Sequence, residues 1–179
     1  MFYTLLGWTG LLMTISKPAF VWLTIGIIRM SRVWGSAAIV FLIAFDVLDG
    51  VLFRASPLAA YKKLARVRRW VDVIGDRLGI QWVALTLVVI YNFPFTFYAA
   101  ITAREIVLIC IVTYSFATRR PLQEPNNPSR AAATMDGATG ISWMLLGWTT
   151  AVYCLVLMTV FAVISFYKYF RTIAETPKK

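Results

Sequence analysis

Long apolar runs separated by short polar segments are the feature that most constrains this chain. Hydrophobic residues make up 60% of its 179 residues, well above the share usual for soluble domains. Only helices and closed barrels satisfy every backbone polar group in hydrocarbon, and these runs lack the alternating period of barrel strands. We therefore predict an all-α, polytopic integral membrane protein. Because a span needs about 20 apolar residues, we expect about six transmembrane helices in a single domain covering residues 1–179.

The apolar runs and the turn signals between them place the expected spans. The first is interrupted by Lys17-Pro18, so we expect part of it to be an interfacial helix followed by a short span. Asn92-Phe93-Pro94 marks a turn, and the last apolar stretch, too long for one span, is best divided near Gly147–Thr150. The expected bounds are Leu5–Ile28, Val33–Phe53, Trp70–Tyr91 and Phe95–Thr118, then a polar loop at Arg119–Arg130, then two spans within Ala131–Phe170.

Basic residues set the expected orientation, because they favour the cytoplasmic side of short loops. The segment after the second span is rich in them: Arg54, Lys62, Lys63, Arg66, Arg68 and Arg69. The loop at Arg119–Arg130 and the C-terminal tail are also basic, so we expect both termini to face the cytoplasm of a bacterial inner membrane. Arg29 and Arg32, in a turn expected on the opposite side, are the exception. The net charge of +10 does not indicate nucleic acid, since the charges cluster at membrane edges near anionic head groups.

The aspartates are the most informative residues, because the chain has only eight acids and ionisable groups inside spans are costly. Asp46 and Asp49 share one helix face near the end of the second span, and Asp72 and Asp76 share one near the start of the third. The connecting segment puts both pairs at the same membrane depth. Four carboxylates there would repel one another unless cations intervened, and such hard oxygen ligands suit Mg²⁺, Mn²⁺ or Ca²⁺. The pattern predicts a site for one or two divalent ions.

A simpler interpretation is that the aspartates pair with nearby arginines, such as Arg54 and Arg77, and anchor helix ends. Gly50 and Arg54 favour the active interpretation. A glycine permits close ligand approach, and an arginine one turn later can hold phosphate with two hydrogen bonds. Neither residue excludes the simpler interpretation of the aspartates as helix anchors. Gly50 could serve helix packing, and Arg54 could be a basic flank of the span.

In this region the sequence resembles the CDP-alcohol phosphotransferase family, nearest to its phosphatidylglycerophosphate synthases. That family carries Asp-x-x-Asp-Gly-x-x-Ala-Arg, a spacer, and then Gly-x-x-x-Asp-x-x-x-Asp. Here Asp46, Asp49, Gly50 and Arg54 match the first half, and Asp72 and Asp76 match the acids of the second. A weaker likeness is the segment 103–106 in the fourth span, Ala-Arg-Glu-Ile.

The resemblance implies a dimeric membrane enzyme that transfers a phosphatidyl-type group from a CDP-linked lipid, such as CDP-diacylglycerol, to an alcohol such as glycerol 3-phosphate, releasing CMP. By the same analogy, Asp46, Asp49, Asp72 and Asp76 bind the metal, with Asp76 also the general base, and Asp49, Gly50 and Arg54 bind the CDP moiety. Basic residues of the following segment, Lys62, Lys63, Arg66 and Arg68, could bind a phosphorylated acceptor or anionic lipid. Their other explanation is topology, because short cytoplasmic loops are ordinarily basic.

Several features leave alternatives open. Phe53 and Arg68 stand where the family has small residues, which allows a catalytically inactive relative that serves as a membrane interaction protein. A small cation transporter is the third hypothesis, because Arg104 and Glu105 fall deep in the fourth span. That pair could equally brace neighbouring helices. Asp136, at the expected entry to the fifth span, could approach the site or cap a helix, and a helix cap is the preferred interpretation.

Overall fold

A computed structural model describes residues 2–118 and 127–175, apart from the side chains of residues 2–4, 6, 58, 59, 62–74, 112, 115 and 116. Within these residues the chain forms six α-helices and one short 3-10 helix, and no strand. The α-helices are α1 (Phe2–Met30), α2 (Arg32–Arg54), α3 (Lys62–Tyr91), α4 (Phe95–Ala117), α5 (Asn127–Leu145) and α6 (Trp148–Glu175), and the 3-10 helix is η1 (Pro57–Ala60). The prediction of an all-α fold is confirmed.

Three helices are long and apolar enough to cross a membrane, judged by length and composition over the described residues. They are Gly7–Met30, Arg32–Arg54 and Trp148–Glu175. Large apolar side chains such as Leu12, Ile15 and Trp22 point outward from α1 instead of into the protein. Such exposed apolar surface suits contact with lipid. The protein is an all-helical membrane protein, and the crossing of all six helices stays a prediction.

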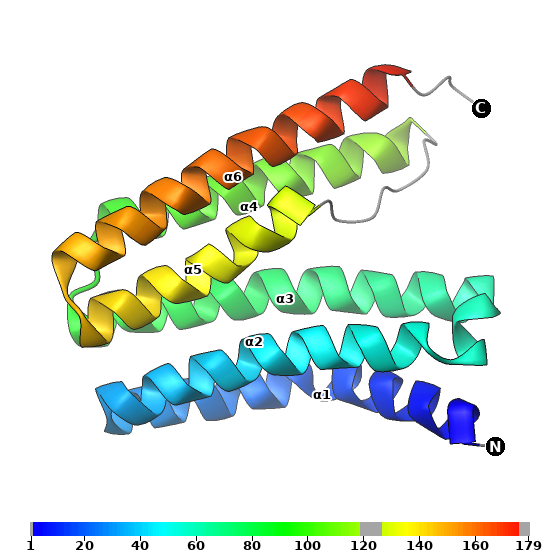
Figure 1. The fold of residues 1–179 in the computed structure, drawn as a ribbon, viewed down its shortest axis with the longest axis horizontal. Helices are drawn as coiled ribbons and strands as arrows, with labels where there is room; N and C mark the ends of the chain where they lie inside the picture. The colour runs from blue at the N-terminus through cyan, green and yellow to red at the C-terminus, as the bar shows by residue number, and fades with distance from the viewer. Residues whose placement is uncertain (1, 119–126, 176–179) are drawn as a thin grey trace. The chain divides into compact units, whose positions relative to one another are not determined.

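The chain divides into two compact units, residues 1–91 and 92–179. In the first unit α1 packs against both α2 and α3. In the second, α6 packs against both α4 and α5. Figure 1 shows these two sets of long helices. The single domain predicted over residues 1–179 remains a prediction.

The first helix is continuous through Pro18, so the predicted interruption at Lys17-Pro18 does not end it. Proline removes one backbone hydrogen bond from a helix, and packing on neighbouring helices can offset this loss. Figure 1 shows α1 changing direction about halfway along its length, the usual consequence of an internal proline. Lys17 therefore lies in the middle of a long helix and not at its end.

Two glycines let α1 approach its neighbours closely. A Cβ atom added to Gly10 would lie 2.9 Å from the backbone nitrogen of Phe53 and 3.0 Å from the carbonyl oxygen of Asp49. A Cβ atom at Gly79 of α3 would lie 2.9 Å from the Val21 side chain of α1. The close approach at Gly10 sets one turn of α1 against the part of α2 that carries Asp49, and the close approach at Gly79 sets α1 against α3.

The connection between α2 and α3 is shorter than predicted. α2 ends at Arg54, and α3 already begins at Lys62 because the segment that follows is rich in strong helix formers without a breaker. The basic residues expected in a loop instead belong to the first turns of α3: Lys62, Lys63, Arg66, Arg68 and Arg69. Their side chains lie outside the described residues.

The predicted turns of the second half are confirmed. Asn92 adopts a left-handed backbone (φ 51°), which asparagine tolerates better than most residues, between α3 and α4. Gly147 separates α5 from α6 with φ 88°, and its N–H donates to the Ser142 carbonyl at 2.8 Å. The core of this unit includes Leu108, Ile111 and Tyr169.

Candidate functional site

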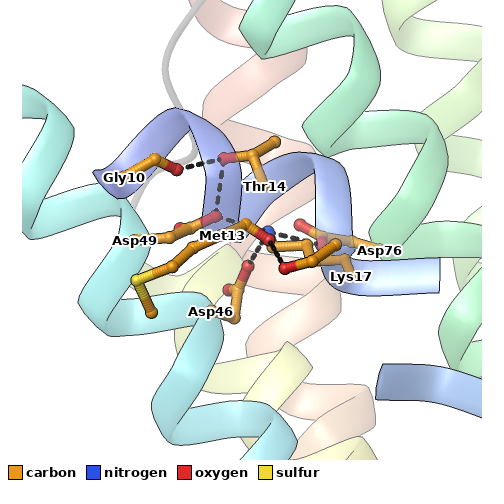
Figure 2. Close-up of polar contacts among 8 residues, drawn as sticks. Gly10, Met13, Thr14, Lys17, Asp46, Asp49 and Asp76 are labelled. Carbon is orange, nitrogen blue, oxygen red and sulfur yellow. Dashed lines mark hydrogen bonds and ion pairs between the residues drawn. The ribbon is translucent and has the colours of Figure 1, made fainter. Parts of the chain in front are cut away.

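Three of the predicted aspartates meet in the first unit, around a residue that the sequence argument used only as a helix interruption. The ammonium of Lys17 contacts Asp46, lies 2.9 Å from Asp76 Oδ1 and lies 3.2 Å from Asp49 Oδ2. Figure 2 shows Lys17 on α1 reaching toward two acids of α2 and one of α3. Helical spacing aligned Asp46 with Asp49, and packing of α1 against both other helices brought in Asp76.

The side chains of the cluster differ in solvent exposure. The side chains of Lys17 and Asp49 are only 4% and 1% exposed, whereas those of Asp46 and Asp76 are 48% and 35% exposed. A buried charge is tolerated only when partners surround it, so Asp49 and Lys17 form the fixed inner part. Asp46 and Asp76 form the part that a substrate could reach.

Thr14 is a second residue that the sequence argument missed. Its hydroxyl contacts Asp49 Oδ2 at 2.8 Å and the Gly10 carbonyl oxygen at 3.0 Å, and the side chain is buried (Figure 2). Thr14 and Lys17 are three apart in α1, so both face the same part of α2. The available signal was Lys17, since an ionisable residue inside an apolar span usually has a partner or a function.

Two other predicted site residues, Gly50 and Arg54, follow Asp49 in α2. Gly50 lies beside the Arg54 side chain, where an added Cβ atom would be 3.3 Å from a guanidinium nitrogen. Arg54 is exposed at the last turn of α2. The side chain of Asp72, like those of Lys62, Lys63, Arg66 and Arg68, lies outside the described residues.

The arrangement can accept a cation, because the chain's own ammonium already lies among three carboxylates. Carboxylate oxygens are also the donors that hard divalent ions prefer. Among the described side chains, however, no group of three or more His, Cys, Asp or Glu is spaced to hold a metal ion. The donor chemistry fits Mg²⁺ or Mn²⁺, and Lys17 occupies the place where the acids converge.

Phe53, which differs from the family pattern, packs where α2 meets α1. It is buried, and its backbone nitrogen and Cβ atom face Gly10 of α1. The large residue is accommodated because the residue opposite has no side chain.

The second unit contains a distinct buried charge network. Arg104 of α4 pairs with its neighbour Glu105 at 2.8 Å and with Asp136 of α5, and it donates to the Ser129 carbonyl at 3.3 Å. All three charged side chains are buried. This arrangement agrees with the bracing role considered for Arg104 and Glu105. The interpretation of Asp136 as a helix cap is wrong, because α5 begins at Asn127 and Asp136 lies inside it.

Comparison with known proteins gives one family match. A family model described as CDP-alcohol phosphatidyltransferase matches residues 8–169, which is most of the chain and includes the aspartate cluster. Neither the curated proteins nor the solved structures gave a significant match. Over this extent the match shows that the chain belongs to the CDP-alcohol phosphatidyltransferase family, whose members transfer a phosphatidyl-type group from a CDP-linked alcohol in phospholipid synthesis.

Proposed function

We propose that this protein is a metal-dependent transferase that moves a phosphatidyl group from CDP-diacylglycerol, or a similar CDP-linked lipid, to an alcohol such as glycerol 3-phosphate, with release of CMP. The observation that carries the proposal is the convergence of Asp46, Asp49 and Asp76 from two helices on one cation position. Family membership supports the reaction class, and this cluster supports the place where it occurs.

The proposed ligands of Mg²⁺ or Mn²⁺ are the four aspartates of the motif: Asp46, Asp49, Asp72 and Asp76. When bound, one or two such ions would neutralise the diphosphate and the charge that develops on it. Thr14 would hold Asp49 in a fixed orientation through their hydrogen bond. Fixing a ligand through a neighbouring hydrogen bond is a general feature of metal sites.

Asp76 is the proposed general base. Its side chain is 35% exposed and so can reach an incoming alcohol. The alcohol oxygen attacks the phosphorus that carries the lipid, its proton passes to Asp76, and the bond from that phosphorus to the CMP oxygen breaks. Gly50 and Arg54 would contact the CDP moiety together with Asp49, because the guanidinium can bind phosphate through two hydrogen bonds.

The acceptor side is proposed to lie at the start of α3. Basic residues there could bind a phosphorylated acceptor or anionic lipid head groups: Lys62, Lys63, Arg66 and Arg68. Their abundance also agrees with a cytoplasmic face. We place the site and both termini on the cytoplasmic side of a bacterial inner membrane, in a homodimer.

CMP release tests the proposal directly. Purified protein in detergent is incubated with CDP-diacylglycerol, Mg²⁺ or Mn²⁺ and a panel of acceptors that includes glycerol 3-phosphate and inositol phosphate. We expect release that requires metal and acceptor and that Asp76→Asn and Asp72→Asn each reduce at least a hundredfold. Glu175→Gln is the matched control, because Glu175 is an exposed acid that pairs with Arg171 one turn away in α6.

A negative result distinguishes the alternatives. If no acceptor gives CMP, binding of CDP-diacylglycerol is measured on the same sample. Binding without turnover would mean that the correct acceptor was absent from the panel. Loss of both binding and turnover would refute the transferase and favour an inactive membrane interaction protein.

A further inference from the structure

Lys17 belongs to the aspartate cluster of the first unit but has no role in the proposed reaction. Its side chain is almost completely buried, although a lysine ammonium is strongly hydrated and costly to bury. The ammonium contacts three carboxylates that come from two different helices. A buried lysine with this many acidic partners acts as the cation of the cluster.

The position of Nζ conflicts with a divalent ion on the same carboxylates. Nζ lies 2.9 Å from Asp76 Oδ1 and 3.2 Å from Asp49 Oδ2, so it occupies the space between these oxygens. Mg²⁺ binds oxygen at about 2 Å and needs near-octahedral geometry, which leaves no room for an ammonium among the same oxygens. A divalent ion and the Lys17 ammonium among the same oxygens would also repel each other strongly.

We infer that Lys17 is a tethered cation that holds the aspartate cluster together without metal and competes with the divalent ion for it. This inference rests on the proposed function, because it assumes that the cluster is the metal site. Metal entry then requires the Lys17 side chain to leave the carboxylates. The four-carbon stem of lysine gives the ammonium the reach to move while α1 stays in place.

The inference predicts opposite effects of one substitution on stability and on metal binding. Lys17→Met removes the ammonium and keeps a long apolar stem. Without metal the three carboxylates lose their shared partner, so the melting temperature of Lys17→Met in EDTA should fall by several degrees relative to wild type. With the competitor gone, Mn²⁺ should bind at least tenfold more tightly and restore the melting temperature.

The experiment measures Mn²⁺ binding by electron paramagnetic resonance and thermal unfolding in EDTA and in Mn²⁺, on full-length protein in detergent. Lys168→Met is the matched control, because it removes one exposed positive charge from α6. If Lys17→Met does not fold without metal, it is purified in Mn²⁺. Lys17→Gln, which keeps hydrogen-bond donors without the charge, provides a second measure of affinity.

The outcomes separate this inference from the proposed function. Tighter Mn²⁺ binding in both Lys17 variants, with the control unchanged, supports competition. Unchanged or weaker Mn²⁺ binding in Lys17→Met, with wild type binding normally, would overturn the role of Lys17 and leave the metal site standing. Absence of Mn²⁺ binding in wild type and in every variant would overturn the metal site of the proposed function and this inference with it.

Discussion

Replacement of Gly10 by alanine tests how closely α1 and α2 approach. The added methyl would lie 2.9 Å from one backbone atom of Phe53 and 3.0 Å from one of Asp49. Backbone atoms of a helix cannot rotate away as a side chain can, so the helices must separate. Overpacking of this kind costs about 1–3 kcal/mol. Alanine also favours a helix over glycine by about 1 kcal/mol, which partly offsets that cost.

Gly26→Ala isolates the packing effect. Gly26 belongs to the same helix, and nothing lies within 4 Å of its added Cβ atom, so this variant receives only the gain in helix propensity. The difference between the two variants is therefore the overpacking cost. For a chain of this size about 1 kcal/mol changes the melting temperature by roughly 2–4 °C.

The assay is thermal unfolding of both variants in the same detergent, followed by CMP release. We expect Gly10→Ala to melt several degrees below Gly26→Ala. It should also lose more activity, because separation of the helices draws Thr14 away from Asp49. Equal melting temperatures for the two variants would refute the close approach of α1 and α2.

Three further predictions concern Thr14, Arg104 and the requirement for metal. Thr14→Val removes the hydroxyl that contacts Asp49 and should lower the free energy of unfolding by about 1.5–3 kcal/mol. Thr14→Ser keeps the hydroxyl and should stay near wild type. Equal melting temperatures for the two variants would contradict the role of that hydrogen bond. Arg104→Met leaves Glu105 and Asp136 buried without their guanidinium partner and should lower the free energy of unfolding by about 3–5 kcal/mol, measured by thermal unfolding. Wild-type stability of this variant would show that the network is not structural. Chelation by EDTA should abolish CMP release and added Mg²⁺ or Mn²⁺ should restore it, so activity that persists in EDTA would argue against a metal-dependent reaction.

The helical fold and the first half of the site could be predicted because they depend on local periods. Apolar runs of membrane-spanning length predicted the helices, and Gly147 and Asn92 marked turns through their tolerance of unusual backbone angles. The spacing of Asp46 and Asp49 placed both on one face of α2 for the same reason. The start of α3 was predicted too late, because the basic segment after η1 was interpreted by its charge and not by its helix propensity.

The sequence by itself determined an all-helical membrane protein and the family to which its aspartates point, since helix period and hydrophobicity act over a few neighbouring residues. Tertiary structure alone decided that Lys17 and Thr14 join those aspartates. An ion pair between residues far apart in sequence depends on how closely two helices approach, and here Gly10 of α1 permits the close approach to α2. The same reason explains Asp136. Hydropathy placed it at a helix entry, but the packing of α4 and α5 against α6 brings it to Arg104.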